Sequence, residues 1–131
     1  MKSLNPADID LEAIRQRAYA PYSKFQVAAL AISEAGAHVG TNMENAAYPE
    51  GICAEGAALS AMTTAGGRQL KFLRLIGPPG VAIRPCGGCR QKIAEFASAE
   101  TRIECQEADG SLRVFTLEEL LPGSFSADDL R

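Results

Sequence analysis

The chain has 131 residues, of which 47% are hydrophobic and 22% charged, and its formal net charge is −3 at pH 7. This length predicts a single domain over residues 1–131, large enough to bury roughly two thirds of its unfolded surface. No apolar run approaches the ~20 residues needed to span a bilayer. The sequence also lacks a cluster of Lys and Arg interleaved with aromatic residues, which nucleic-acid binding would normally require. We therefore expect a small-molecule partner, no nucleic acid and no membrane.

Helices are predicted from capping residues at their starts and glycines at their ends. Asn5 is a good N-cap, and Pro6 is tolerated in the first helical turn because its missing N–H is not needed there. Thr116 and Glu119 form a capping box. Gly66-Gly67 is expected to stop a buried helix rich in Ala, Leu and Met. The expected helices cover residues 5–19, 53–65 and 86–97, with a short last one from 116.

Strands are predicted where apolar and β-branched residues lie between turn signals. The expected strands cover residues 25–32, 37–41, 72–76, 102–106 and 112–115. The first two form a hairpin that turns at Gly36, and the polar residues 42–52 form a loop. Strands alternating with buried helices predict an α/β fold, a three-layer α/β/α arrangement with a mixed central sheet. Its βαβαβ core is expected from Phe72 onward, with antiparallel strands added by the hairpin.

Two cysteine motifs carry the candidate chemistry. Cys53-Ala54-Glu55 is followed later in the chain by Pro85-Cys86-Gly87-Gly88-Cys89. Three thiolates suit zinc, and three protein ligands leave a fourth position open, as in catalytic zinc sites. Glu55 next to such a metal is a candidate proton carrier. Both motifs fall at predicted helix starts, where the positive helix ends would stabilise a negative cluster.

Two other uses of the cysteines stay open at this stage. The four cysteines could form two disulfides, or Cys105 could close a structural four-cysteine zinc site. Residues 1–6 lack the long apolar stretch of a signal peptide, so we expect a cytoplasmic, reducing compartment, where disulfides are uncommon. Cys105 alternates with Ile103 in a strand-like pattern, which favours a thiol facing the core.

The two motifs together match the zinc-deaminase signature H-x-E…P-C-x-x-C, in which Cys can replace His. The chain resembles the cytidine deaminase family, in particular its small, three-cysteine, homotetrameric form. The resemblance runs from about Tyr19 to the end of the chain. Beyond the zinc motifs it includes Tyr19-Ala20-Pro21-Tyr22-Ser23-Lys24-Phe25, Asn42-Met43-Glu44-Asn45-Ala46-Ala47-Tyr48-Pro49, Cys89-Arg90-Gln91 and Glu119-Leu120-Leu121-Pro122-Gly123-Ser124-Phe125.

This resemblance implies an enzyme of pyrimidine salvage with one Zn²⁺ per subunit, held by Cys53, Cys86 and Cys89. Zinc lowers the pKa of a bound water toward ~7. Glu55 would take the proton of that water, pass it to N3 of cytosine and then protonate the leaving amine. The expected reaction is hydrolytic deamination of cytidine and deoxycytidine to uridine and deoxyuridine, with release of ammonia.

The substrate contacts are likewise implied by the resemblance. Asn42 and Glu44 match the pair that hydrogen-bonds the ribose 3′-hydroxyl, and Phe25 matches the aromatic residue beside the pyrimidine. Ala54 is assigned to the substrate site as well. Tyr48 and Phe125 match positions that reach a neighbouring subunit's site, which implies a homotetramer with shared active sites. From the residues alone, the aromatic ones would be read as packing residues.

The chain departs from the family where many members have Arg directly after the catalytic Glu. It has Gly56 there, so three thiolates lose a neighbouring cation. Arg90, next to Cys89, is the residue we expect to compensate the charge, together with the two helix starts. Ala28, where Gly is usual, is a second departure. His38, the one histidine, is assigned no ligand role.

Three rival functions share parts of this pattern. A related deaminase could act on another aminated nucleoside or a nucleoside antibiotic. A nucleic-acid-editing deaminase has the same core, but the basic surface it needs is missing. From a different class, the chain could be a non-catalytic, zinc-stabilised binding module, and replacing Glu55 by Gln distinguishes this from an enzyme.

Overall fold

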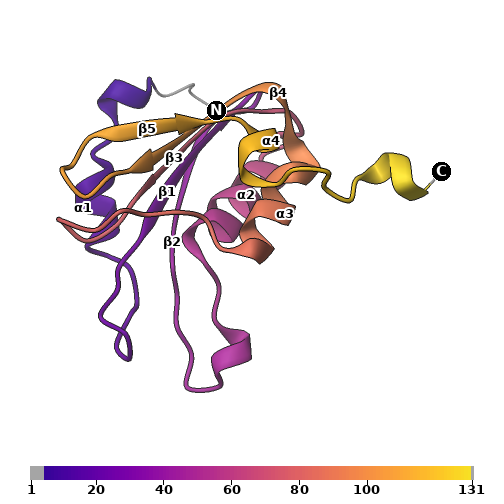
Figure 1. Cartoon of the computed structure of the whole chain (residues 1–131). Helices are drawn as coiled ribbons and strands as arrows, with labels where there is room; N and C mark the ends of the chain where they lie inside the picture. The colour runs from indigo at the N-terminus through magenta and orange to yellow at the C-terminus, as the bar shows by residue number, and fades with distance from the viewer. Residues whose placement is uncertain (1–4, 131) are drawn as a thin grey trace.

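The protein is described here from a computed structural model that covers residues 5–130, so residues 1–4 and 131 of the expected domain lie outside the described part. A five-stranded sheet in the order β2-β1-β3-β4-β5 forms its centre (Figure 1). The strands are β1 (Ala28–Ser33), β2 (Gly36–Thr41), β3 (Leu70–Ile76), β4 (Ala97–Gln106) and β5 (Leu112–Phe115). The helices are α1 (Leu11–Arg15), α2 (Ala54–Thr64), α3 (Gly87–Phe96) and α4 (Leu117–Leu120), with 3₁₀ turns at Pro6–Asp8, Tyr48–Glu50 and Ala127–Leu130.

The strand directions decide where the helices begin. β1 is antiparallel to both β2 and β3, and β3 is parallel to β4, so β2, β3 and β4 run the same way. Their carboxyl ends therefore lie at one edge of the sheet, and α2 and α3 follow β2 and β3 from that edge. The expectation of a βαβαβ core from Phe72 onward was wrong. The alternating unit runs from β2 to β4, because the tight turn at Gly110 returns β5 antiparallel to β4.

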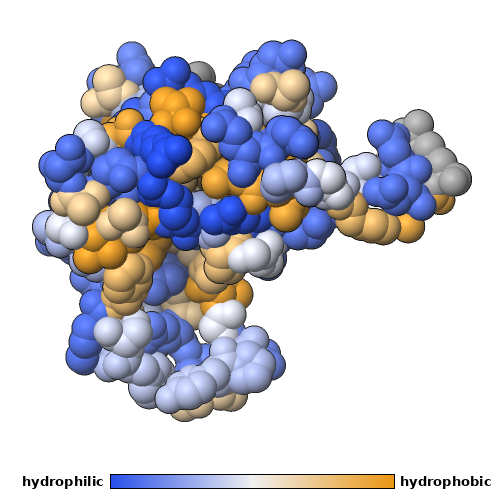
Figure 2. Space-filling view, viewed as in Figure 1, coloured by the Kyte–Doolittle hydropathy of each residue, from blue (hydrophilic) through white to orange (hydrophobic). Residues whose placement is uncertain are grey.

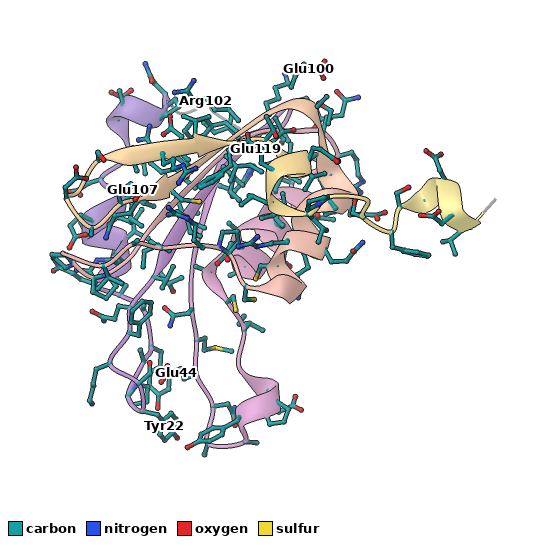
Figure 3. All side chains as sticks on the ribbon, in the orientation of Figure 1. Tyr22, Glu44, Glu100, Arg102, Glu107 and Glu119 are labelled. Atoms are coloured by element: carbon teal, nitrogen blue, oxygen red, sulfur yellow. The ribbon has the colours of Figure 1, made fainter. Side chains whose placement is uncertain are left out.

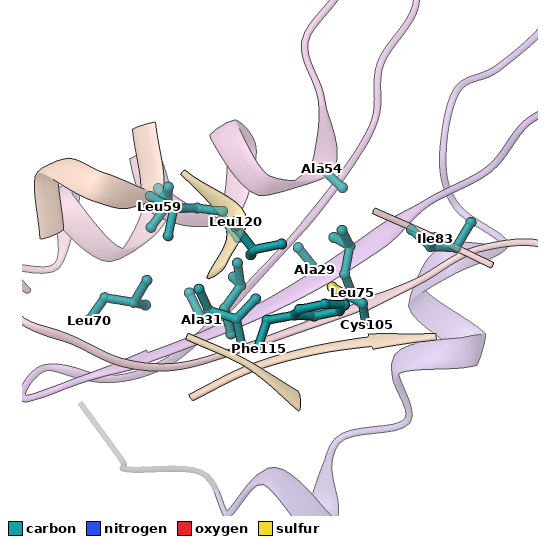
Figure 4. Close-up of a cluster of buried hydrophobic side chains, with 14 of the residues drawn as sticks. Ala29, Ala31, Ala54, Leu59, Leu70, Leu75, Ile83, Cys105, Phe115 and Leu120 are labelled. Carbon is teal, nitrogen blue, oxygen red and sulfur yellow. The ribbon is translucent and has the colours of Figure 1, made fainter. Parts of the chain in front are cut away.

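Helices cover both faces of the sheet, as a three-layer α/β/α fold requires (Figure 1). Residues of α2, α3 and α4 pack on one face with alternate β1 residues such as Ala29 and Ala31. The intervening β1 residues, Ala28 and Leu30, face α1 with Leu11. β1 is thus buried on both sides, which explains its almost uninterrupted apolar sequence. Figure 4 shows the larger cluster between the sheet and the helices.

Gly40 lets α2 approach the sheet closely. A Cβ at this position would lie 2.4 Å from the Ala58 amide nitrogen and 2.7 Å from the Ala54 carbonyl oxygen. Real side chains do not tolerate such distances to backbone atoms, so only Gly fits here without a shift of the helix. The position of the first turn of α2 therefore depends on the missing side chain of Gly40.

The N-terminal helix is shorter than expected. Asn5 does act as a cap, because its side chain accepts a hydrogen bond from the Ala7 amide, but the turn it opens ends at Asp8. Asp10 then caps a new helix by accepting from the Ala13 amide at 3.0 Å. Two competing caps so close together split one helix into two short turns. Strand β1 also begins later than expected, at Ala28 rather than residue 25.

Strands β3 and β4 also begin earlier than residues 72 and 102, at Leu70 and Ala97, whereas the turns and helix ends agree with the sequence prediction. The hairpin turns at Gly36 (φ 99°), α2 stops before Gly66 (φ 96°), and Thr116 and Glu119 form the capping box of α4. None of the helices among residues 5–130 is long and apolar enough to cross a membrane.

Candidate active site

Two helix starts bring the three cysteines together. Cys53 is the N-cap of α2 and Cys86 the N-cap of α3, while Cys89 lies one turn further along α3. The three Sγ atoms all lie within 4.8 Å of one another, and those of Cys53 and Cys86 are 3.9 Å apart. They meet because α2 and α3 both begin at the carboxyl edge of the parallel strands, where α/β folds commonly bind ligands.

The sulfur cluster fits a tetrahedral zinc ion. Zn–S bonds of about 2.3 Å in a tetrahedron place two sulfurs about 3.8 Å apart, close to the observed Cys53–Cys86 separation. The group found among the described residues contains no fourth ligand. Cys105 is a free thiol with no exposed surface and belongs to the hydrophobic core, as the strand pattern predicted. The residues present therefore suit a tetrahedral zinc site with three protein ligands and one open position.

The thiols share their protons unequally before a metal binds. A hydrogen bond from the Cys89 thiol, assisted by Cys86, lowers the pKa of Cys53 to about 6. The same hydrogen bond raises the pKa of Cys89, which is buried as well. Zinc binding must release the remaining protons, because only thiolates are ligands.

Glu55 lies in the first turn of α2 and is only 4% exposed. Burial is the main cause that raises the pKa of its carboxyl group, and the neighbouring Cys53 thiolate acts in the same direction. A carboxyl group whose pKa moves toward neutrality is suited to accept and release protons. Glu55 follows the N-cap Cys53 by two residues, and its carboxyl group interacts with the side chains of Cys53 and Cys89.

A cavity of about 300 Å³ opens in front of Glu55. It combines several residues that the sequence had singled out with others that it had not. The first group is Phe25, Asn42, Cys53, Ala54, Glu55 and Cys86, and the second is Val27, Leu75, Ala82, Ile83 and Arg84. Of the second group, no sequence signal marked Arg84, which forms an ion pair with Glu107 beside the cavity. Ala54 is fully buried, above the sheet that carries Leu75 (Figure 4).

The polar loop residues hold the backbone next to this cavity. The Asn42 side chain accepts from the Val27 amide at 2.9 Å and donates to the Phe25 carbonyl at 2.8 Å. Glu44 accepts from the amides of Tyr22 and Ser23 and from the Ser23 hydroxyl. Glu44 and Tyr22 lie together at the tips of two adjoining loops (Figure 3). These bonds, led by the one from the Ser23 hydroxyl, lower the pKa of Glu44.

The remaining aromatic candidates lie outside the cavity. Tyr48 is 80% exposed, and its ring meets that of Tyr22 edge-on, with the centroids 6.4 Å apart. With Glu44 it lines a separate hollow of about 410 Å³. Phe125 is 57% exposed on the C-terminal segment, which projects from the body of the molecule (Figure 2). Within one chain these two residues are therefore not brought to the cysteines.

Arg90 lies next to Cys89, and its guanidinium group binds backbone oxygens. Its Nε donates to the Pro85 carbonyl and one Nη donates to the Leu120 carbonyl, both at 2.8 Å. These bonds connect the segment that carries Cys86 to α4. Lys92, which the sequence had not singled out, lines a larger cavity of about 920 Å³ together with the three cysteines.

A comparison with protein families identifies the family of this chain. Residues 10–105 match the model described as "Cytidine and deoxycytidylate deaminase zinc-binding region". The chain belongs to the cytidine deaminase family. The cytidine deaminase of Halalkalibacterium halodurans is 38% identical over 122 residues, which cover 91% of this chain and 92% of the relative. That of Mycobacterium tuberculosis is 40% identical over 114 residues, or 86% of this chain and 82% of the relative.

Solved structures agree with the fold. The crystal structure of cytidine deaminase from Burkholderia pseudomallei aligns with a TM-score of 0.80 at 36% identity, covering 88% of this chain and 93% of that one. Within this family's zinc-binding region, the ion is bound by Cys53, Cys86 and Cys89. The mixed sheet flanked by helices is the cytidine deaminase fold that the sequence predicted.

Proposed function

We propose that this chain is a zinc-dependent cytidine deaminase that hydrolyses cytidine and deoxycytidine to uridine and deoxyuridine and releases ammonia. One observation carries the proposal: the buried Glu55 lines the same cavity as Cys53 and Cys86. Phe25 and Asn42 line this cavity as well. Relatives that align over most of the chain carry the name cytidine deaminase. The activity belongs to pyrimidine salvage in a reducing, cytoplasmic setting, which the need for three free thiolates supports.

Glu55 is the proton carrier of the proposed reaction. Bound zinc supplies the site with a water of lowered pKa. Glu55 accepts a proton from that water and delivers it to N3 of the cytosine ring while the water oxygen bonds to C4. Glu55 then takes the remaining proton from this oxygen and passes it to the amino group, which leaves as ammonia as the C4–N bond breaks and the C4 carbonyl forms. Its burial and raised pKa support this role, because the carboxyl group must hold a proton near neutral pH before giving it up. One water is consumed and one ammonia leaves per turnover.

The nucleoside lies between the loops and the start of α2 in this proposal. Phe25 is 39% exposed and lines the cavity, which supports a contact with the face of the pyrimidine. Ala54 offers a small, buried wall beside Glu55. Asn42 and Glu44 bind the ribose 3′-hydroxyl. Each keeps unused hydrogen-bonding capacity after its bonds to the backbone, since an amide nitrogen has two donors and each oxygen several acceptor sites.

A homotetramer with shared active sites is part of the same proposal. The exposure of Tyr48 and Phe125 supports it, because such large aromatic side chains gain from burial against another subunit. The large cavity along α2 supports it too, since it includes His38, whose two buried ring nitrogens have no hydrogen-bond partner among the described residues.

Mixing Phe125→Ala subunits with Glu55→Gln subunits tests sharing. Hybrid tetramers should regain activity if each site uses Phe125 from a neighbour, whereas a self-contained site gives no recovery.

Arg90 is proposed to support the charged cluster by holding its scaffold. Its bond to the Pro85 carbonyl fixes the residue before Cys86, and its charge lies on the same helix as Cys89. Replacing Arg90 with Gln should slow turnover or weaken zinc retention markedly. Unchanged kinetics and zinc content would remove Arg90 from the site.

The decisive experiment follows the ultraviolet spectrum of purified protein with cytidine, deoxycytidine, cytosine and adenosine, together with a zinc assay. We expect loss of the cytidine and deoxycytidine absorbance and about one zinc per chain. Glu55→Gln should reduce kcat by about 10²–10⁴-fold while keeping zinc. Glu118→Gln is the matched control, because Glu118 holds the same first-turn position in α4 but is exposed and away from the cavity.

The alternatives give different results in that assay. Turnover of adenosine alone, or of another aminated nucleoside in place of cytidine, would assign the chain to a related deaminase. Stoichiometric zinc without turnover of any nucleoside, and with no effect of Glu55→Gln, would indicate a zinc-stabilised binding module instead.

A further inference from the structure

The zinc centre of this chain has an excess of negative charge. Three thiolates and one Zn²⁺ sum to a net charge of −1, and the buried Glu55 adds a further carboxyl group beside it. Concentrated charge of one sign is costly where burial limits the access of water. The residue that follows Glu55 is Gly56, so the first turn of α2 offers no side chain to offset this charge.

Lys92 fills the space above that turn. It lies on α3, three residues after Cys89, and its stem crosses to α2. A Cβ at Gly56 would lie 3.6 Å from Cδ of Lys92, and a Cβ at Gly88 would lie 3.7 Å from its Nζ. The ammonium group is therefore close to the first turn of α3, from which Cys86 and Cys89 project. The same cavity wall contains Lys92 and all three cysteines.

The other nearby cations have different partners. Arg90 binds two carbonyl oxygens, and Arg84 forms an ion pair with Glu107. Lys92 forms no ion pair with a described residue. Its charge is therefore available to the three cysteines that line the same cavity.

We propose that the Lys92 ammonium group neutralises the three-thiolate zinc centre and raises its affinity for zinc, reaching it through the space left by Gly56 and Gly88. Lys92 is a positioning and charge-balancing residue rather than a catalytic one, because it acts through the cysteines. The inference deepens the proposed function, since it concerns the metal of the same site, but it does not depend on which nucleoside is deaminated.

The experiment measures zinc affinity by competition with a chromogenic chelator, at low and at high salt. Lys92→Met keeps the length of the stem and removes the charge. We expect about tenfold weaker zinc binding, the lower end of the range for groups that support metal ligands, because the side chain is exposed. Added salt should shrink the difference, as it screens an exposed cation. Lys92→Arg should keep most of the affinity, and Lys71→Met, an exposed lysine on β3, is the matched control.

A second variant moves the cation to the other helix. Gly56→Arg in the Lys92→Met background places a guanidinium group in the vacated space, and it should restore zinc affinity toward the original value. The inference is overturned if Lys92→Met binds zinc as tightly as the unaltered protein, or if Lys71→Met loses as much zinc affinity as Lys92→Met. It is also overturned if the double variant has an unaltered Tm but its zinc affinity is not restored. Because the readout is zinc affinity, a protein without cytidine deaminase activity still gives an answer, and the two proposals fail separately.

Discussion

The two ends of the active site differ in how much of them a single chain builds. At the metal end, Cys89 and Glu55 are 1% and 4% exposed, and two helices fix them against the sheet. Tyr48 and Phe125, which we propose to reach the nucleoside in a neighbouring subunit, are 80% and 57% exposed, on a loop and a projecting tail. The core thus positions the cysteines and Glu55, whereas the residues proposed to recognise the nucleoside depend on loops. Loops gain a fixed position only from a few hydrogen bonds or from a neighbour.

The largest expected effect comes from removing a metal ligand at the buried end. Cys89→Ser should weaken zinc binding by more than about 100-fold, since changes outside the ligand set already cost up to that amount, and deamination should fall with it. Cys105→Ser is the matched control in the core. It should lose about 1–3 kcal/mol of unfolding free energy, because a hydroxyl group replaces a buried thiol, and keep its zinc. Loss of zinc in the Cys105 variant would instead support a closed structural site in which Cys105 is the fourth zinc ligand.

A smaller effect is expected from disturbing the scaffold without touching a ligand. Gly40→Ala would force a Cβ to within 2.7 Å of two backbone atoms of α2. We expect about 1–3 kcal/mol lower stability in urea unfolding and a measurable drop in zinc affinity, because the helix that carries Glu55 must shift. Gly87→Ala should change neither, since a Cβ there meets open space. Equal behaviour of the two variants would show that the sheet does not fix the metal end.

The smallest effect on chemistry is expected at the loop end, from two carboxylates that are bound in a similar way. Glu44 accepts from the Tyr22 and Ser23 amides, and Glu34, in the hairpin turn at the opposite edge of the sheet, accepts from the Arg68 and Gln69 amides. Glu44→Gln should raise KM for cytidine about tenfold with little change in kcat, the range for losing a hydrogen bond to a charged group. Glu34→Gln should leave both constants unchanged.

The same pair tests the dependence of stability on pH. Hydrogen bonds from Ser23 lower the pKa of Glu44, and those from the Arg68 and Gln69 amides lower the pKa of Glu34. Each carboxylate therefore stabilises the folded chain at neutral pH, and this contribution is lost as the pH falls through the lowered pKa. Acid unfolding followed by circular dichroism should show a shallower loss of stability in each Gln variant. A slope unchanged from the unaltered protein would contradict the role of these bonds.

Much of this molecule was predictable from local patterns. The capping box at Thr116, the turn at Gly36 and the stop at Gly66 depend on residues a few positions apart, and all three predictions were confirmed. The N-terminal helix was predicted wrongly. Asp10 competes with Asn5 for the cap, and a sequence pattern does not say which of two adjacent caps prevails.

The spacing of residues along the chain was enough to indicate the kind of centre. Three cysteines and one Glu match the zinc-deaminase signature, which predicts a zinc ligand set beside a carboxyl group that we propose as the proton carrier. Which cation approaches that centre depends on how the two helices pack against each other. Arg90, adjacent to Cys89 in sequence, binds backbone carbonyls, whereas Lys92 reaches across to Gly56. The reason is geometric. Parallel strands bring the starts of α2 and α3 to one edge of the sheet, and the residue spacing within either helix does not determine the distance between the two helix surfaces.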